Sequence, residues 1–157
     1  MIIAGIDPGP RKSALTIIED NKPIMNIWDD NKVIEDIVRW EEYDVLGYEW
    51  VACYGNAVGE DVLRTGHECG RLSAVMLPEA KLYEQTRPQI IHHLCGKRNL
   101  PKSATRAALI DRWGGKEATK KGNPLYKIYK HMWDSLAVCV YIMEEHYGKP
   151  ETYWRTT

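Results

Sequence analysis

Short hydrophobic runs separated by turn residues make up much of the first half of the chain. Their length and their content of β-branched side chains are typical of buried strands. Asp20-Asn21-Lys22 lies between two of these runs and has the composition of a hairpin turn. Together the runs predict five β-strands, at residues 2–6, 13–18, 23–28, 45–52 and 81–85.

Apolar residues return at three- and four-residue steps in the intervening and later segments, which is the spacing of amphipathic helices. This spacing predicts helices at residues 32–42, 59–77, 88–94, 103–113 and 125–147. Gly122 and Gly148 bracket the last helix, and Pro124 stands where a first-turn proline is tolerated. The order of elements predicts an α/β fold, a mixed sheet flanked by helices, in one domain spanning residues 1–157.

The composition is that of a globular protein. The chain has 157 residues, of which 44% are hydrophobic and 27% charged, which excludes a disordered tail, a fibre and a small disulfide-stabilised toxin. No apolar run approaches the roughly 20 residues of a membrane span, and residues 1–7 are too short for a signal peptide. The four cysteines form no C-x-x-C pair, so we expect free thiols in a cytoplasmic protein.

The net charge of −1 conceals a strongly basic segment. Residues 87–130 contain eleven Lys or Arg and only two acids, whereas the rest of the chain contains ten bases and twenty acids. Such a segment predicts an electropositive face for a polyanion. The alternative is a solvated helix surface that happens to be basic.

Two carboxylates interrupt apolar strands. Asp7 ends the first predicted strand, and Glu49 lies inside the fourth. A buried carboxylate is costly unless it is paired or binds a cation. A right-handed crossover would make these strands parallel neighbours, which places both carboxylates close together. The alternatives are a turn-initiating Asp7 before Pro-Gly and a Glu49 that faces solvent.

The last predicted helix adds a third acidic position. His131 and Asp134 are three residues apart and share one helix face, and Asp134 is the only residue charged at neutral pH between Met132 and Met143. Carboxylates with one imidazole suit Mg²⁺ or Mn²⁺ better than zinc, and such a set suits two-metal phosphoryl transfer. The alternative is a polar patch facing solvent.

These motifs, in this order, resemble the RuvC-type Holliday junction resolvases of the ribonuclease-H-like superfamily. The similarity covers nearly the whole chain. It rests on Ile2-Ile3-Ala4-Gly5-Ile6-Asp7-Pro8-Gly9, on Glu49 before Val51-Ala52-Cys53-Tyr54-Gly55, on Arg87-Pro88-Gln89, on residues 107–112, on Gly114-Gly115-Lys116 and on His131-x-x-Asp134.

The resemblance implies a ribonuclease-H-like five-stranded sheet and a homodimeric endonuclease that makes two symmetric nicks in a four-way DNA junction. Carried over by position, the catalytic and metal-binding residues would be Asp7, Glu49, His131 and Asp134, with two Mg²⁺ or Mn²⁺ ions in each active site. Many members place a wedging aromatic soon after the second acid. Here Ala52-Cys53 occupy that place, and Tyr54 is the nearest aromatic.

Phosphate contacts are expected from the basic segment. The candidates are Lys116, Lys120 and Lys121 in a Gly- and Lys-rich loop, and Lys127 and Lys130 just before the His131-x-x-Asp134 pair. Such residues would position the cut strand without reading its sequence.

The same residues are compatible with other functions. The same fold could cut branched or flap DNA, or structured RNA, or bind junctions without catalysis. His67-x-Cys69 and His92-His93-x-Cys95 are candidate zinc ligands, although their spacings fit no standard zinc module. The chain suits a bacteriophage as well as a bacterium, and no branch-migration partner is indicated.

Overall fold

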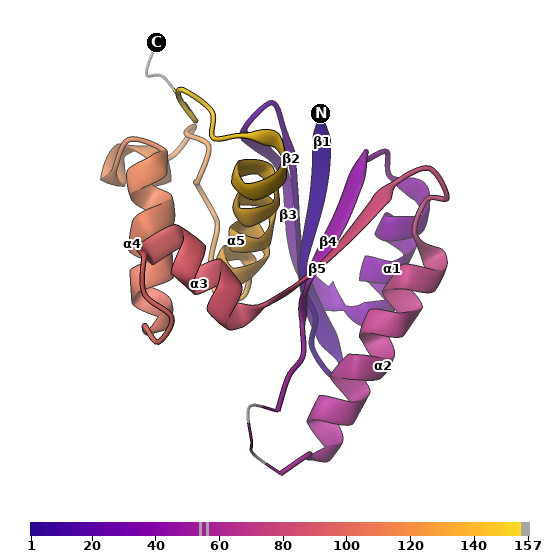
Figure 1. Ribbon diagram of the computed structural model, residues 1–157. Coiled ribbons are helices and arrows are strands. Elements are labelled where there is room, and N and C mark those ends of the chain that lie inside the picture. The colour runs from indigo at the N-terminus through magenta and orange to yellow at the C-terminus, as the bar shows by residue number, and fades with distance from the viewer. Residues whose placement is uncertain (54, 56, 155–157) are drawn as a thin grey trace.

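A five-stranded mixed sheet forms the centre of the protein. The computed structural model describes residues 1–53, 55 and 57–154. The strands are β1 (Ile2–Asp7), β2 (Lys12–Glu19), β3 (Lys22–Asp30), β4 (Val45–Trp50) and β5 (Lys81–Thr86), in the spatial order β3-β2-β1-β4-β5. β1, β4 and β5 are parallel, whereas β2 is antiparallel to both of its neighbours (Figure 1). The predicted mixed five-stranded sheet is confirmed.

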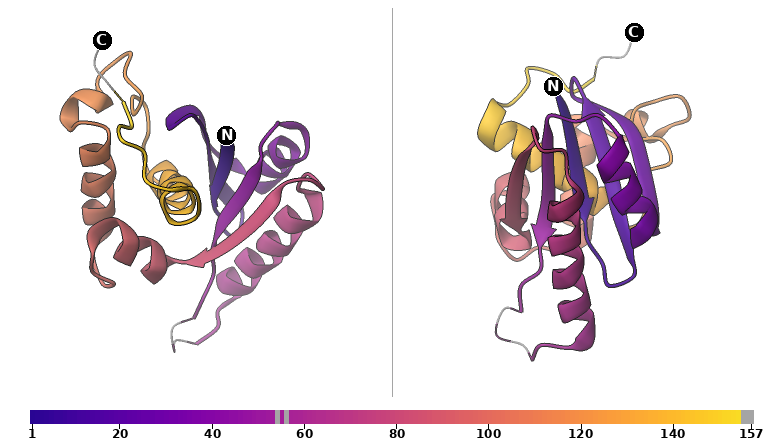
Figure 2. Two further views of the ribbon diagram at one scale, coloured as in Figure 1. Left: turned by 45° about the horizontal axis from the view of Figure 1, so that its top comes forward. Right: turned by 90° about the vertical axis from the view of Figure 1, so that its right-hand side faces the viewer.

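Helices cover both faces of this sheet. α1 (Asn31–Trp40) and α2 (Glu60–Val75) lie on one face. α3 (Arg87–Cys95), α4 (Lys102–Arg112) and α5 (Met132–Ile142) lie on the other, with α5 against the sheet and α4 beyond it (Figures 1 and 2). A short 3₁₀ helix (Lys116–Thr119) follows α4, and a π-helical turn (Met143–Tyr147) follows α5.

Local signals explain two of the tight connections. Asp20 and Asn21 have φ values of 46° and 67°, which suit the hairpin between β2 and β3. Between β5 and α3, the Thr86 backbone N–H donates to Gln89 Oε1 at 2.7 Å in a capping box. Because this cap starts α3 directly after β5, it holds Arg87 at the carboxyl end of the strand.

The predicted helix over residues 125–147 is wrong in its first turns. α5 begins at Met132, and residues before it follow an irregular path in which Lys127 and Lys130 have φ values of 67° and 49°. Leu125 and Ile128 are nevertheless buried. Their apolar spacing therefore reflects an irregular segment that packs on the core, and not a helix.

α5 lies unusually close to the centre of the sheet. Ten of its eleven residues are buried. A Cβ atom added to Gly5 would lie 2.6 Å from the Ser135 carbonyl oxygen, and one added to Gly47 would overlap Ile142. Ser135 Oγ also hydrogen-bonds Thr16 Oγ1 at 2.8 Å. Glycine in β1 and β4 thus permits the close approach that brings the first turn of α5 to the end of β1.

None of the described helices combines the length and the apolarity that a membrane crossing requires. Within the described residues, all four cysteines are free thiols, as expected, and Cys69 and Cys139 are buried.

Gly5→Ala is expected to destabilise the protein by roughly 3 kcal/mol, because the added methyl group would overlap the α5 backbone. Urea unfolding measures this change. Gly70→Ala in α2 is the matched control, because nothing lies within 4 Å of the added Cβ and a helix favours alanine. Equal stability of the Gly5→Ala variant and the wild type would contradict the close packing of α5.

Candidate active site

The parallel pairing of β1 and β4 brings two carboxylates to one end of the sheet. Ile6 lies opposite Tyr48 in the register, so the next residues, Asp7 and Glu49, lie on neighbouring strands at their carboxyl ends. Their side chains are 16% and 18% exposed, so neither carboxylate is fully solvated. Glu49 therefore does not face open solvent.

The start of α5 completes an acidic group. His131 precedes the helix and donates an Nδ1–H hydrogen bond to Asp7 Oδ2 at 2.8 Å. Asp134 lies in the first turn with a side chain only 6% exposed, which excludes the solvent-facing alternative. One ligand atom each from Asp7, His131 and Asp134 lies within 4.8 Å of the others. No other group of three or more His, Cys, Asp or Glu in the described part of the chain is this compact.

Two cations from the basic segment balance these carboxylates. Arg87 Nη1 lies 3.3 Å from Asp134 Oδ1 and 3.6 Å from Glu49 Oε2. Lys102 Nζ, at the start of α4, lies 2.5 Å from Asp134 Oδ2. Because close carboxylates repel one another, these ion pairs stabilise the cluster. The Lys102 side chain is 60% exposed, so it can leave Asp134 without disturbing the core.

Burial and charge change the ionisation of two residues here. Burial, assisted by the charge of Asp7 and opposed by that of Arg87, raises the pKa of Glu49 to about 7. The hydrogen bond to Asp7 raises the pKa of His131, against the opposing effect of its burial. Without a bound cation, the cluster therefore holds protons that oxygen and nitrogen ligands of a metal would have to release.

An open cavity of about 840 Å³ contains most of this group. Trp28 forms one wall, with its ring centroid 5.6 Å from that of His131. Lys130 Nζ lies 4.4 Å and Lys12 Nζ 5.8 Å from the centroid of the Trp28 ring. The lining residues are Asp7, Pro8, Gly9, Pro10, Arg11, Lys12, Trp28, Glu49, Asp61, Arg87, Lys102 and His131.

Side-chain hydrogen bonds secure the loop that follows Asp7. The Gly9 N–H donates to Ser13 Oγ at 3.2 Å, and the Ser13 hydroxyl donates to Asn31 Oδ1 at 2.8 Å. Asn31 in turn donates its side-chain N–H to the Gly9 carbonyl at 3.0 Å, and its backbone N–H to the Arg11 carbonyl at 3.0 Å. These bonds hold the Asp7–Arg11 segment in place beside the cavity.

The donor set fits a hard divalent cation. Two carboxylates and one imidazole are the oxygen-rich ligands that Mg²⁺ and Mn²⁺ prefer. Glu49 lies outside the compact three-residue group, with the Arg87 guanidinium between it and Asp134. The side chains of Asp7, His131 and Asp134 are therefore close enough to bind one ion together, and Glu49 lies at the edge of the same site.

The predicted DNA-binding lysines divide into two groups. Lys130 lies against Trp28, which forms a wall of the large cavity. Lys127 lies on the same segment, with its Nζ 5.6 Å from the Tyr126 ring centroid. Lys116, Lys120 and Lys121 follow the far end of α4, where Arg112 binds Glu144 beyond the end of α5. They thus lie at the opposite end of α4 from Lys102. Tyr54 lies outside the described residues.

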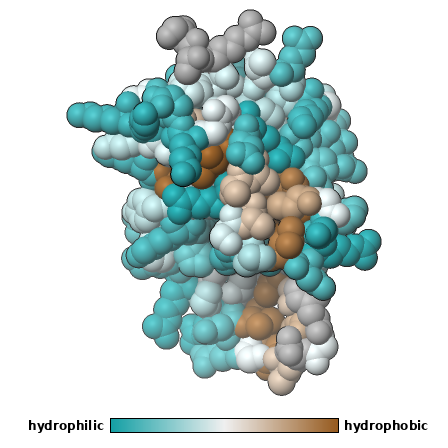
Figure 3. All heavy atoms as spheres, turned by 90° about the vertical axis from the view of Figure 1, so that its left-hand side faces the viewer, coloured by the Kyte–Doolittle hydropathy of each residue, from teal (hydrophilic) through white to brown (hydrophobic). Residues whose placement is uncertain are grey.

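The basic segment forms the side of the molecule that carries α3 and α4. Figure 3 shows this side as largely hydrophilic, with apolar side chains exposed in its middle. Sequence reasoning identified its charge but not the cations that matter most at the site, Arg87 and Lys102. Both belong to the basic segment, and Arg87 also belongs to the Arg-Pro-Gln motif. Nothing in the sequence pattern indicated Trp28.

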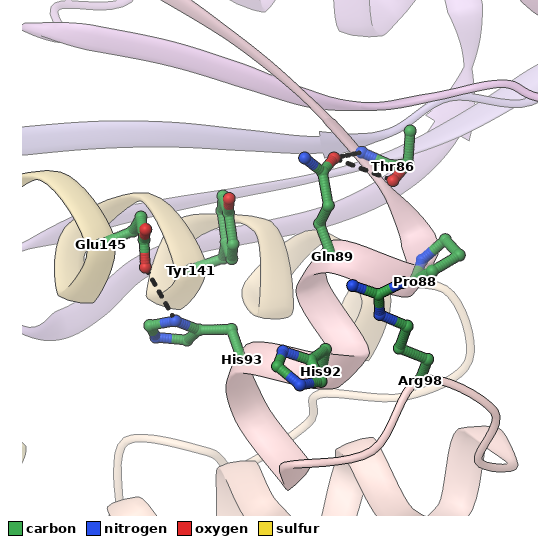
Figure 4. Close-up of a pocket in the computed structure, with 8 residues that line it drawn as sticks. All are labelled: Thr86, Pro88, Gln89, His92, His93, Arg98, Tyr141 and Glu145. Atoms are coloured by element: carbon green, nitrogen blue, oxygen red, sulfur yellow. Dashed lines mark hydrogen bonds and ion pairs between the residues drawn. The ribbon is translucent and has the colours of Figure 1, made fainter.

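The zinc candidates do not gather into a metal site. Among the described residues, neither His67 with Cys69 nor His92, His93 and Cys95 joins a compact group of ligands. His93 instead contacts two carboxylates, Glu144 at 2.8 Å and Glu145 at 3.1 Å. Figure 4 shows His92 and His93 in a cavity of about 420 Å³, lined by Thr86, Pro88, Gln89, His92, His93, Arg98, Tyr141 and Glu145.

Comparison with known proteins identifies the fold. No family model matches the chain, and no curated protein matches it in sequence. A structure of Thermus thermophilus RuvC is 15% identical, with a TM-score of 0.72 over 94% of this chain and 97% of that chain. T. thermophilus RuvC in complex with a Holliday junction substrate is 16% identical, with a TM-score of 0.67 over 90% and 92% of the two chains. The chain therefore has the ribonuclease-H-like fold of RuvC.

Glu49→Gln is expected to stabilise the metal-free protein at alkaline pH. Because the folded carboxyl has a pKa of about 7 and an ordinary one has 4.5, the unfolded chain releases this proton first as the pH rises. Ionised Glu49 therefore lowers the free energy of unfolding progressively between these values, and fully above pH 7. We expect the variant to gain about 2 kcal/mol at pH 8 and almost nothing at pH 4.5, measured by urea unfolding in EDTA.

Glu41→Gln is the control, because Glu41 is an exposed residue just after α1. It should change the stability by less than about 0.5 kcal/mol at either pH. A Glu49→Gln effect that does not depend on pH would show that the carboxyl titrates normally.

Proposed function

We propose that this protein is a RuvC-type, metal-dependent endonuclease that cuts four-way DNA junctions. The observation that carries the proposal is the compact group of Asp7, His131 and Asp134 with Glu49 beside it, at the carboxyl ends of β1 and β4. The RuvC fold of the chain, and the junction bound by one of the RuvC structures, support the choice of substrate.

In this proposal, Asp7, His131 and Asp134 would hold one divalent cation. Glu49 would be a ligand of a second cation, or an additional ligand at the edge of the first site. Bound Mg²⁺ or Mn²⁺, two per site, would supply an activated water and charge stabilisation at the leaving oxygen. His131 would have to be neutral to bind a metal through Nδ1, so it would give up the proton that it shares with Asp7.

Arg87 and Lys102 supply the positive charge beside Asp134 that a bound metal ion would replace. Each neutralises Asp134 in the metal-free site, and each lines the large cavity. A metal ion held by Asp134 would weaken the attraction that holds the Lys102 ammonium there. The exposed Lys102 side chain would then be free to contact a phosphate of the cut strand.

Further cations near the site would position the DNA. Lys12 and Lys130 flank Trp28 at the wall of the cavity, where a phosphate adjacent to the cut one would lie. Lys127 would extend this track. Lys116, Lys120 and Lys121 lie at the other end of α4, so we propose that they contact a part of a junction arm away from the cut.

Two symmetric nicks require two active sites. The described part of one chain contains one compact acidic group. We therefore propose a homodimer in which each single-domain subunit cuts one strand. Tyr54 stays our candidate for the contact near the junction centre. Junctions of this kind arise in the cytoplasm of a bacterium or of a phage-infected host, and we place the protein there.

Asp7→Asn should abolish cutting and preserve junction binding, because it removes a charged ligand without changing the shape of the side chain. We expect the cleavage rate to fall by roughly 1000-fold or more in Mg²⁺. The measurement uses a labelled four-way junction, with the nicks mapped on sequencing gels and binding followed by gel shift without Mg²⁺. Flap DNA and an RNA duplex serve as alternative substrates.

Asp20→Asn is the matched control, since Asp20 lies in the β2–β3 hairpin and asparagine tolerates its positive φ. It should cut like the wild type. Undiminished cleavage by the Asp7→Asn protein would remove Asp7 from the catalytic set. Preferential cutting of a flap or of RNA would overturn the proposed substrate but not the nuclease.

Two pairs of lysine variants separate binding near the cut from binding on an arm. Lys12→Ala with Lys130→Ala should lower both junction affinity and the cleavage rate at saturation. Lys120→Ala with Lys121→Ala should lower the affinity alone. Each pair should reduce the slope of log Kd against log salt concentration by about 1–2. An unchanged slope for either pair would show that those lysines do not contact phosphates.

A further inference from the structure

Trp28 contacts two consecutive residues of the segment that leads into α5. Its ring centroid lies 5.6 Å from that of His131, with 32° between the two ring planes. The Lys130 ammonium lies 4.4 Å from the centroid of the same ring, within the range of a cation–π interaction. One side chain of β3 therefore touches both a candidate metal ligand and a candidate phosphate contact.

The backbone at Lys130 allows both side chains to reach one ring. Lys130 has a φ of 49°, in the left-handed region that residues other than glycine, asparagine and aspartate rarely adopt. Side chains of consecutive residues usually point in different directions, but the left-handed turn lets those of Lys130 and His131 both meet Trp28. Such a conformation persists only where surrounding contacts hold it, and it is typical of functional sites.

Trp28 has a firm place in the sheet, whereas His131 does not. Trp28 lies opposite Ala14 in the register of β2 and β3, and its partly buried side chain packs against the same core as α5. The His131 side chain is 48% exposed and precedes the first residue of α5. Contacts with the Asp7 carboxylate and with the Trp28 ring orient this exposed imidazole.

Metal binding would remove one of these two contacts. The His131 Nδ1–H donates to Asp7 in the metal-free protein, and this hydrogen bond would end if Nδ1 bound a metal ion. The rings of Trp28 and His131 are only 32° from parallel, so Trp28 packs on the face of the imidazole and leaves its nitrogens free. The Trp28 contact is therefore the one that can persist in both states.

We propose that Trp28 is a positioning residue, which holds His131 in the orientation that binds a metal ion and holds Lys130 where it binds the adjacent phosphate. The inference rests on the proposed function and adds to it a residue outside the acidic group. Contacts that orient a metal-binding histidine typically change metal affinity by roughly 10- to 100-fold when they are removed. Because one ring contacts both residues, it keeps the metal ligand and the cation in a constant relative position.

The test measures Mn²⁺ affinity without DNA, by electron paramagnetic resonance, and junction affinity without metal, by gel shift in EDTA. Trp28→Leu keeps an apolar side chain and removes the aromatic face. It should weaken Mn²⁺ binding roughly tenfold and junction binding about threefold. Trp28→Phe, which retains a ring, should recover most of both losses. Trp28→Met repeats the test with a second non-aromatic side chain, and urea unfolding verifies that each variant is folded.

Trp40→Leu is the matched control. Trp40 is the last residue of α1 and is 77% exposed, so its ring contributes little to packing. This variant should bind both Mn²⁺ and the junction like the wild type.

Double variants show whether Trp28 acts through its two neighbours. His131→Ala has already lost the ligand, so adding Trp28→Leu should change the Mn²⁺ affinity by less than about twofold. Lys130→Ala has already lost the ammonium, so the same addition should change the junction affinity by less than about twofold. A merely structural role of Trp28 would give the full loss in both backgrounds.

The outcomes separate this inference from the proposed function. Trp28→Leu and Trp28→Met proteins that bind Mn²⁺ like the wild type would overturn the positioning role and leave the nuclease intact. Losses that persist in full in the His131→Ala or the Lys130→Ala background would overturn it as well. If the wild type neither binds Mn²⁺ nor cuts any junction, the proposed function fails, and the role of Trp28 fails with it.

Discussion

The close contact between α5 and the two central parallel strands determines where every candidate functional group lies. Gly5 leaves room for the helix backbone and Gly47 for the Ile142 side chain, and the Ser135–Thr16 hydrogen bond fixes the position of the helix along β2. As a consequence, the first turn of α5 reaches the carboxyl end of β1. Asp134 and His131 meet Asp7 there, although more than 120 residues separate them in sequence. A larger residue at Gly5 would overlap the α5 backbone and move the acidic group apart.

Charge balance is the second constraint at this end of the sheet. Three carboxylates with little exposure would repel one another without counter-charges, and Arg87 and Lys102 supply them. In the proposed metal-bound state, the exposed Lys102 side chain would leave Asp134 and a divalent cation would take its place. One end of the sheet thus contains an acidic centre and the two cations that balance its charge.

The strands and the acidic positions could be predicted because each has a local signal. Asp7 and Glu49 interrupt apolar strands, and Asp134 is the only charged residue in an apolar helix. Because burying an unpaired carboxylate is costly, these three positions stand out in the sequence. The start of α5 could not be predicted, since Leu125 and Ile128 are buried at helical spacing without forming a helix. The wall formed by Trp28, and the pairing of Lys102 with Asp134, depend on tertiary contacts that no periodicity encodes. Charge alone likewise could not separate Lys130 from the distant lysines 116, 120 and 121.

Anomalous diffraction from crystals grown with Mn²⁺ tests the central claim most directly, because it locates the ions without relying on activity. We expect anomalous peaks between Asp7 and Asp134, with the Lys102 ammonium displaced from the Asp134 carboxylate. Mn²⁺ bound only elsewhere, with the Lys102–Asp134 ion pair intact at a concentration that supports junction cleavage, would contradict a metal centre at this end of the sheet.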